Sequence, residues 1–67
     1  MTAAEFEELT TDEAESLLRR RLWSFIGAGA APGEALLLAA QVEVPERAAA
    51  QLLRQGLSGD LALRLLY

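Results

Sequence analysis

The stretch "FIGAGAAPGEALLLAA", residues 25–40, decides the fold because a break interrupts an otherwise apolar run. Gly27, Gly29 and Gly33 are spaced G-x-G-x-x-x-G, and Pro32 precedes the last of them. Glycine just past a helix end and proline at a first helical position are the usual helix boundaries. The stretch therefore predicts that one helix ends at Gly27–Gly29 and that a second begins at Pro32.

The same glycines raise the question of a phosphate-binding loop. A dinucleotide-binding fingerprint needs G-x-G-x-x-G after a strand, and a Walker loop needs Gly-Lys-Ser/Thr. Here the spacing differs, the preceding segment has helical periodicity, and the chain has no lysine. Glu34 would also occupy the helix N-terminus where a phosphate binds. We expect a corner between two helices and no bound cofactor.

The helix before this corner is expected over about 11–27. Thr10 and Glu13 form a capping box at its start. Its apolar residues recur at intervals of three and four and give one stripe that faces a core, namely Ala14, Leu17, Leu18, Leu22, Phe25 and Ile26. Residues 1–10 form an acidic N-terminal arm, which either makes a short helix capped by Thr2 or frays.

Three further helices follow the corner. The helix over about 32–41 is apolar all round, which is typical of a helix inside a bundle or against a partner. Pro45 begins the next helix, about 45–55, with Ala48, Ala49, Leu52 and Leu53 on its buried side. Ser58 caps a last helix over about 59–66.

Two segments of the chain resemble each other and form a weak internal repeat. "GAAPGEALLL" (29–38) aligns with "GLSGDLALRL" (56–65), and an apolar pair precedes each first glycine. Both copies predict a helix, a glycine stop, a cap and another helix. No window alternates with period two, so no strand is predicted. We expect an all-α domain over 11–67, with three to four short helices arranged as two glycine-cornered helical hairpins.

Composition excludes several classes of function. The 67 residues carry a net charge of −4 and include neither cysteine nor histidine. Serine and threonine therefore lack their usual activating base, and the usual zinc ligands are absent. The carboxylates cluster in the exposed N-terminal part, where nothing would raise a pKa by desolvation. We expect no enzyme, no catalytic residue, no metal site and no small-molecule substrate.

Residues 22–42 carry one charge and follow Arg19–Arg21, which is the pattern of a signal peptide. Pro32 to Glu34 interrupt this run, however, and an acidic segment precedes the arginines. Targeting peptides start with basic residues instead. We expect no membrane insertion and a cytoplasmic location, or a virion location if the chain is of phage origin.

Trp23 is the sharpest single clue to function. It falls about 140° from the centre of the apolar stripe, beside Arg19. Either the N-terminal arm folds back so that Phe6 or Leu9 covers it while Arg19 stacks on its ring, or Trp23 anchors an interface. In the arginine run, we expect Arg19 to pair with Glu15, Arg20 to face solvent and Arg21 to border the apolar stripe.

The last helix is apolar on almost every side. One face can pack on the helix over 32–41, which would leave Leu63 and Tyr67 uncovered. Together with Trp23, these side chains predict a surface for a protein partner or a second copy. The predicted interface residues are Phe6, Arg19, Trp23, Leu63, Leu66 and Tyr67.

A helix-turn-helix is the alternative. Residues 33–56 have small and apolar residues, a short connection and a second helix that could offer Arg47, Gln51 and Arg54 to a DNA groove. Two arginines on an acidic domain form a poor electrostatic footprint for nucleic acid. Nucleic-acid binding is therefore the second hypothesis.

Residues 17–66 also resemble a group of natural proteins. The Arg-rich helix, the glycine corner, the "ALLLAA" helix and the ending "LLRQGLSGDLALRLL" (52–66) are similar to small uncharacterised helical proteins of high-GC, actinobacterial-type bacteria and their phages. Leu57–Gly59 replaces the Cys-Pro-Pro of that group, and "VEVP" (42–45) replaces its His-containing start. The resemblance implies a compact helical fold and a role in assembly, without a known activity.

Overall fold

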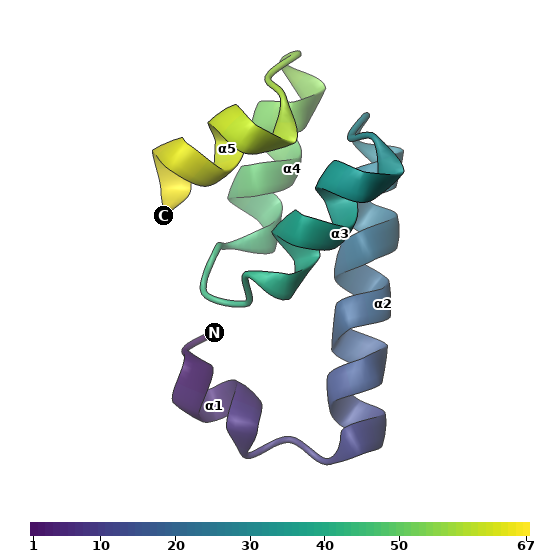
Figure 1. The fold of residues 1–67 in the computed structure, drawn as a ribbon, viewed down its shortest axis with the longest axis vertical. Helices are drawn as coiled ribbons and strands as arrows, with labels where there is room; N and C mark the ends of the chain where they lie inside the picture. Colours follow the sequence, from purple (N-terminus) through teal and green to yellow (C-terminus); the bar gives the residue numbers. More distant parts are fainter.

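A computed structural model describes residues 1–67 and contains only helices, which confirms the all-α class (Figure 1). The five helices are α1 (Ala3–Glu7), α2 (Thr11–Gly27), α3 (Pro32–Ala40), α4 (Glu46–Arg54) and α5 (Gly59–Leu66). Of the two alternatives for the N-terminal arm, the structure has the short helix, with a complete capping box between Thr2 and Glu5. Thr10 and Glu13 cap α2 in the same way.

The helices α2 and α4 end with the same hydrogen-bond pattern. The amide of Gly29 donates to the carbonyl of Ile26, and the next amide, of Ala30, donates to Phe25. Gly56 and the residue after it repeat both bonds at the end of α4. This pair of bonds is a Schellman motif, which needs a left-handed residue after the helix. Gly29 and Gly56 supply it, with φ values of 112° and 96°.

The next helix starts differently after each glycine. Pro32 is the first residue of α3, as the sequence predicts, whereas the Ser58 hydroxyl caps α5 by accepting from the amide of Leu61. Gly59 then lies buried against α3, and a Cβ added there would lie 2.9 Å from Cβ of Glu34. Glycine at this position therefore lets α5 approach α3 closely.

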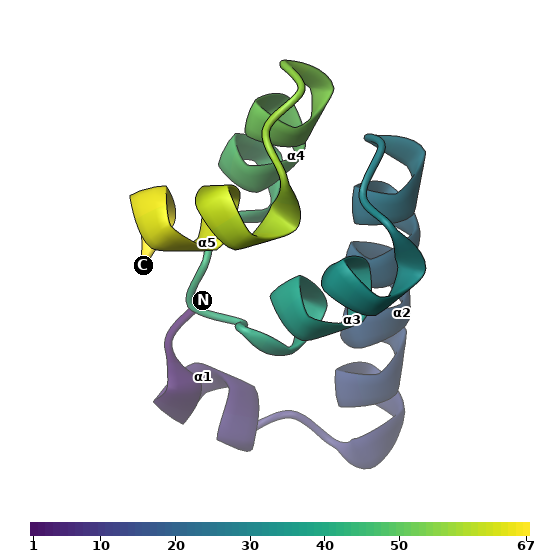
Figure 2. The same cartoon turned by 45° about the horizontal axis from the view of Figure 1, so that its top comes forward.

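The helices α2 to α5 pack around one core. The helix α2 packs on α3 and α4, and α5 packs on the same two helices (Figures 1 and 2). The core is small and rich in alanine, and its fully buried large side chains are Phe25, Leu38 and Val44. The helix α1 buries no residue and lies apart from this core (Figure 2). No helix has both the length and the apolar character that crossing a bilayer requires.

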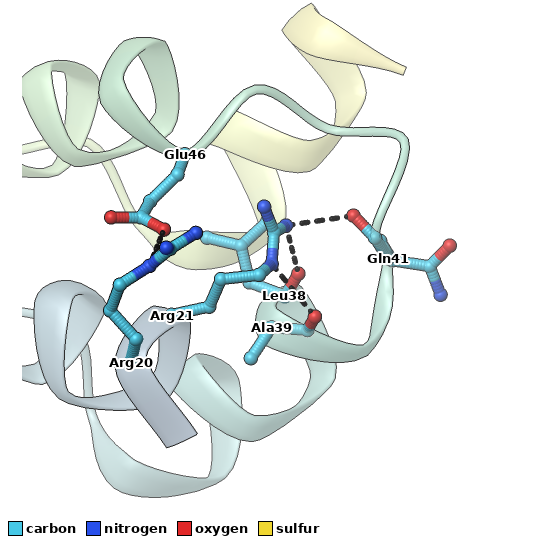
Figure 3. Close-up of polar contacts among 6 residues, drawn as sticks. All are labelled: Arg20, Arg21, Leu38, Ala39, Gln41 and Glu46. Carbon is cyan, nitrogen blue, oxygen red and sulfur yellow. Dashed lines mark hydrogen bonds and ion pairs between the residues drawn. The ribbon is translucent and has the colours of Figure 1, made fainter. Parts of the chain in front are cut away.

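One charged side chain lies inside the core. Arg21 of α2 is only 4% exposed, and its guanidinium lies at the C-terminal end of α3 (Figure 3). Its Nε donates to the carbonyl of Ala39 at 3.0 Å, and its Nη2 donates to Gln41 at 2.8 Å and to Leu38 at 3.4 Å. The carbonyl of Ala39 accepts no backbone hydrogen bond at this helix end, whereas those of Leu38 and Gln41 also accept from the amides of Gln41 and Val44. The arginine therefore acts as a C-terminal cap supplied by another helix.

The surroundings of Arg21 stabilise its charge without a direct ion pair. The C-terminus of α3 carries the negative end of the helix dipole, and the face of Phe25 lies 5.3 Å from the guanidinium carbon. Burial lowers the pKa of Arg21 from its ordinary value by desolvation; the nearby Glu46 raises this pKa and Arg20 lowers it further. Because the ordinary pKa of arginine is so high, the group stays protonated. Arg21 borders the apolar stripe as expected, but its guanidinium is buried in the core rather than placed in solvent.

The glycine corners give a first prediction. Gly56→Ala should lower the free energy of unfolding by about 1–2 kcal/mol, because an L side chain is strained at positive φ. Open space surrounds the position, so no clash contributes to this loss. Gly33→Ala is the matched control: it also lies in open space, but within α3, and should cause no loss. Urea unfolding followed by circular dichroism measures both, and equal losses would contradict the conformational argument.

The buried cap gives a second prediction. Arg21→Met keeps an apolar side chain in place but leaves the Ala39 carbonyl without a donor, so the free energy of unfolding should fall by about 1–3 kcal/mol. Arg20→Met, at the neighbouring exposed position, should cost no more than about 1 kcal/mol. Arg21→Lys, which keeps a charge and part of the donors, should fall between them. If Arg21→Met leaves the free energy of unfolding in urea unchanged, the hydrogen bonds of Arg21 do not stabilise the fold.

Candidate functional site

The exposed Trp23 marks the candidate site. Its side chain is 63% exposed, although Arg21 and Phe25 on the same helix are buried. Residues two apart on a helix point about 200° away from each other. Because Arg21 and Phe25 face the core, Trp23 points away from it. Arginine is ordinarily exposed and tryptophan is ordinarily buried to a large extent, so both side chains depart from their usual burial here.

Trp23 lies in an apolar groove between α2 and α3. The groove has a volume of about 340 Å³ and is lined by Glu15, Leu18, Arg19, Leu22, Trp23, Leu36, Ala39 and Ala40. Leu36 of α3 is 61% exposed and is the second large side chain that this surface leaves uncovered. The groove therefore combines one wall from each helix. The sequence predicted Trp23 and Arg19 for an interface but not Leu36.

The sequence did not identify Leu36 as exposed, because α3 is apolar on every side. The structure buries its Ala35, Leu38 and Ala39 and exposes Leu36 and Leu37. The helix therefore lies at the surface. Of the two expected places, the one inside the bundle is wrong, and the one against a partner stays a prediction. In such a helix the sequence carries no signal for the exposed face; only packing against α2 and α5 selects it.

The N-terminal arm does not cover Trp23. Phe6 and Leu9 are half-buried and instead line a shallow hollow over the first turns of α2, together with Ala14 and Leu18. The one cation–π contact of the structure joins Arg21 to Phe25. The alternative in which the arm covers Trp23 and Arg19 stacks on it is therefore wrong. The hollow and the groove share Glu15 and Leu18, so they form one continuous surface along α2.

The arginines next to the groove form ion pairs. Arg19 pairs with Glu15 at 2.9 Å, as predicted from their spacing, and both side chains stay exposed at the rim. Arg20 was expected to face solvent alone, but it reaches Glu46 of α4 at 3.2 Å (Figure 3). This pair links helices that the local sequence pattern could not relate, because its members are 26 residues apart.

The C-terminal helix differs from the prediction. Leu63 and Leu66 are half-buried and pack against the core, so the expectation that Leu63 stays uncovered is wrong. With Ala62 they form the inward face of α5 at helical spacing. The exposed side chains are Leu61, Leu65 and Tyr67. Of the predicted residues at this end, only Tyr67 remains at the surface.

The residues of the alternative DNA-binding surface share one helix. Arg47, Gln51 and Arg54 are all exposed on α4, and neither arginine forms an ion pair. The helix α4 packs on α2 and α5, and residues 41–45 separate it from α3. A helix-turn-helix requires its two helices to pack against one another. The packing thus gives this alternative little geometric support.

The acidic groups serve as helix caps where their titration is shifted. A hydrogen bond from the Thr2 amide lowers the pKa of Glu5, and one from the Thr10 amide lowers the pKa of Glu13. Both shifts follow from hydrogen bonds that favour the ionised carboxylate. No cluster of three or more acidic side chains could hold a metal ion. The lining of the groove is mainly apolar, with the Glu15–Arg19 pair as its charged edge.

Comparisons with protein-family models, with curated proteins and with solved structures find no match to this chain.

The contrast between Trp23 and Phe25 gives a third prediction. Trp23→Ala should change the free energy of unfolding by no more than about 0.5 kcal/mol, because its side chain is largely exposed. Phe25→Ala, two residues along the same helix, removes a fully buried ring and should cost about 3–5 kcal/mol. Urea unfolding measures both. A large loss for Trp23→Ala would place this side chain in the core and remove the site.

Proposed function

We propose that this chain is a non-catalytic helical module for protein interaction or assembly, which binds through the groove around Trp23. The observation that carries the proposal is the exposed Trp23 opposite a buried Arg21. Burial of a large apolar side chain is worth about 1.5–3 kcal/mol, which this tryptophan does not gain in the single chain. A partner that covers the groove would supply it.

The composition of the groove supports the same proposal. Trp23 and Leu36 form an apolar centre, and the Glu15–Arg19 pair forms a charged rim. Interfaces have this arrangement, in which a few aromatic and arginine side chains provide most of the binding energy and a polar rim excludes water. The resemblance to small helical proteins of bacteria and phages also favours an assembly role.

We further propose that α2–α5 act as two equivalent hairpins. Hairpin 1 consists of α2 and α3 (residues 11–40), and hairpin 2 consists of α4 and α5 (residues 46–66). The shared Schellman motifs at Gly29 and Gly56 support this description, because both connect the two helices of a hairpin by the same turn. Ala35 and Ala62 are both fully buried, 27 residues apart, and support the equivalence of α3 and α5.

DNA binding through α4 is the second candidate. The exposed and unpaired Arg47 and Arg54 favour it. The acidic balance of the chain opposes it, since phosphate contacts need an excess of basic residues. Binding of a short duplex at about 50 mM salt that Arg54→Glu abolishes would support this candidate, and no binding there would exclude it.

The proposed function leads to a fourth prediction. Immobilised wild-type protein should retain a binding partner, a second copy included, that Leu36→Glu loses, because a carboxylate in the groove cannot be buried without a counter-charge. Leu37→Glu is the matched control: the neighbouring residue is equally apolar and exposed but lies outside the groove. It should retain the same partner.

Both variants must keep their helical circular dichroism for the comparison to count. Equal retention by wild type, Leu36→Glu and Leu37→Glu would contradict a role for the groove, as would retention of nothing by the wild type.

A further inference from the structure

The two hairpins bury opposite faces. Adding 27 to a residue number in hairpin 1 gives its equivalent in hairpin 2, as for Gly29 and Gly56. We define the tryptophan face as Leu22, Trp23, Ile26 and Leu36, with the equivalents Ala49, Ala50, Leu53 and Leu63. The phenylalanine face is Arg21, Phe25, Ala28 and Leu38, with the equivalents Ala48, Leu52, Gln55 and Leu65.

The tryptophan face is covered in hairpin 2, whereas in hairpin 1 Leu22 and Ile26 pack against the core but Trp23 and Leu36 stay exposed. Trp23 is 63% exposed, whereas its equivalent Ala50 is 3% exposed. Leu36 is similarly uncovered, whereas its equivalent Leu63 packs against the core. The groove around Trp23 is thus the counterpart of a surface that the fold itself covers in hairpin 2.

The phenylalanine face shows the reverse. Leu38 is 1% exposed in hairpin 1, whereas its equivalent Leu65 is 65% exposed in hairpin 2. Phe25 is fully buried, whereas Leu52 is only half-buried. The phenylalanine face of hairpin 1 and the tryptophan face of hairpin 2 therefore meet in the core, and one face of each kind remains free.

This packing is heterologous, because the two hairpins use different faces. A heterologous contact can be repeated by further units of the same kind. We propose that the groove around Trp23 takes a second copy of this chain, which inserts the free phenylalanine face of its hairpin 2, centred on Leu52 and Leu65. The proposal rests on the interaction function proposed above and names its partner.

The sizes of the side chains favour this pairing. In the core, the bulky Phe25 of one face shares a cluster with the small Ala49 and Ala50 of the other, and Arg21 is buried as well. Between copies the distribution is inverted. The groove offers the bulky Leu22 and Trp23, and the incoming face has Ala48 and Leu52 where hairpin 1 has arginine and phenylalanine. The groove is thus bulkier than its equivalent in hairpin 2, and the incoming face is smaller than its equivalent in hairpin 1, which favours close packing between them.

Each copy then uses its groove once and its free hairpin 2 face once. Such a contact links copies head to tail and forms open chains or closed rings rather than a symmetric dimer. If every copy lacks the groove, or every copy lacks the free hairpin 2 face, no assembly forms. If one copy lacks the groove and another lacks the free hairpin 2 face, one intact contact can still join them.

The test uses sedimentation velocity from about 10 μM to about 1 mM, a range that covers weak self-association. The mass of the wild-type species should rise with concentration and exceed that of two chains of 7.2 kDa each. Leu36→Glu, which blocks the groove, and Leu65→Glu, which blocks the incoming face, should each stay monomeric. An equimolar mixture of the two variants should form a species of two chains and nothing larger. Leu37→Glu, which lies outside both faces, should behave as the wild type.

Trp23 reports the same event, because it is the one tryptophan of the chain. Its emission should shift to shorter wavelength as the wild type associates, and in the mixture, but not in either variant alone.

A wild type that stays monomeric to about 1 mM overturns the proposal. So does a dimer that survives Leu65→Glu but not Leu36→Glu, since two grooves would then face each other. If the groove retains a different protein while the chain stays monomeric, the interaction function stands and self-assembly falls. If the groove retains nothing and the chain stays monomeric, both fall.

Discussion

The guanidinium of Arg21 joins the end of α3 to α2 inside the core. It binds carbonyls at the end of α3, including those of Ala39 and Gln41, and so fixes where that helix stops against α2. Next to it, the Arg20–Glu46 pair ties the start of α4 to the same turn of α2. The connection 41–45 is held between these two contacts, and its Val44 lies in the core. Adjacent arginines thus anchor both ends of one loop.

The same constraint produces the groove. Once Arg21 and Phe25 face the core, helical geometry turns Trp23 to the opposite side. The helix α3 meets α2 through Leu38 and Ala39, so its Leu36 lies exposed beside the tryptophan. The face of α2 that turns inward therefore has two effects: it leaves the core with few large side chains, and it leaves an apolar groove at the surface. Cover by a partner would compensate for the small core.

The helix pairs α2–α3 and α4–α5 show how similar local sequences reach unequal environments. Their corners share hydrogen bonds and positive φ values, because glycine and the preceding apolar residues set these locally. Their buried faces differ because the side chains differ in size: Arg21 and Phe25 fill one side of α2, whereas Ala49 and Ala50 let α4 approach closely on the other.

The sequence by itself determined the helices, their caps, the left-handed glycines and the Glu15–Arg19 pair, because each depends on residues no more than about five positions apart. It also pointed to Trp23, whose place on the helical wheel is a local property. Only the tertiary structure decided that Arg21 is buried, that Arg20 reaches Glu46, and that Leu36 rather than Leu63 is uncovered. Helices that are apolar on all sides have no preferred face until other helices pack against them, and a buried arginine needs the carbonyls of a distant helix end.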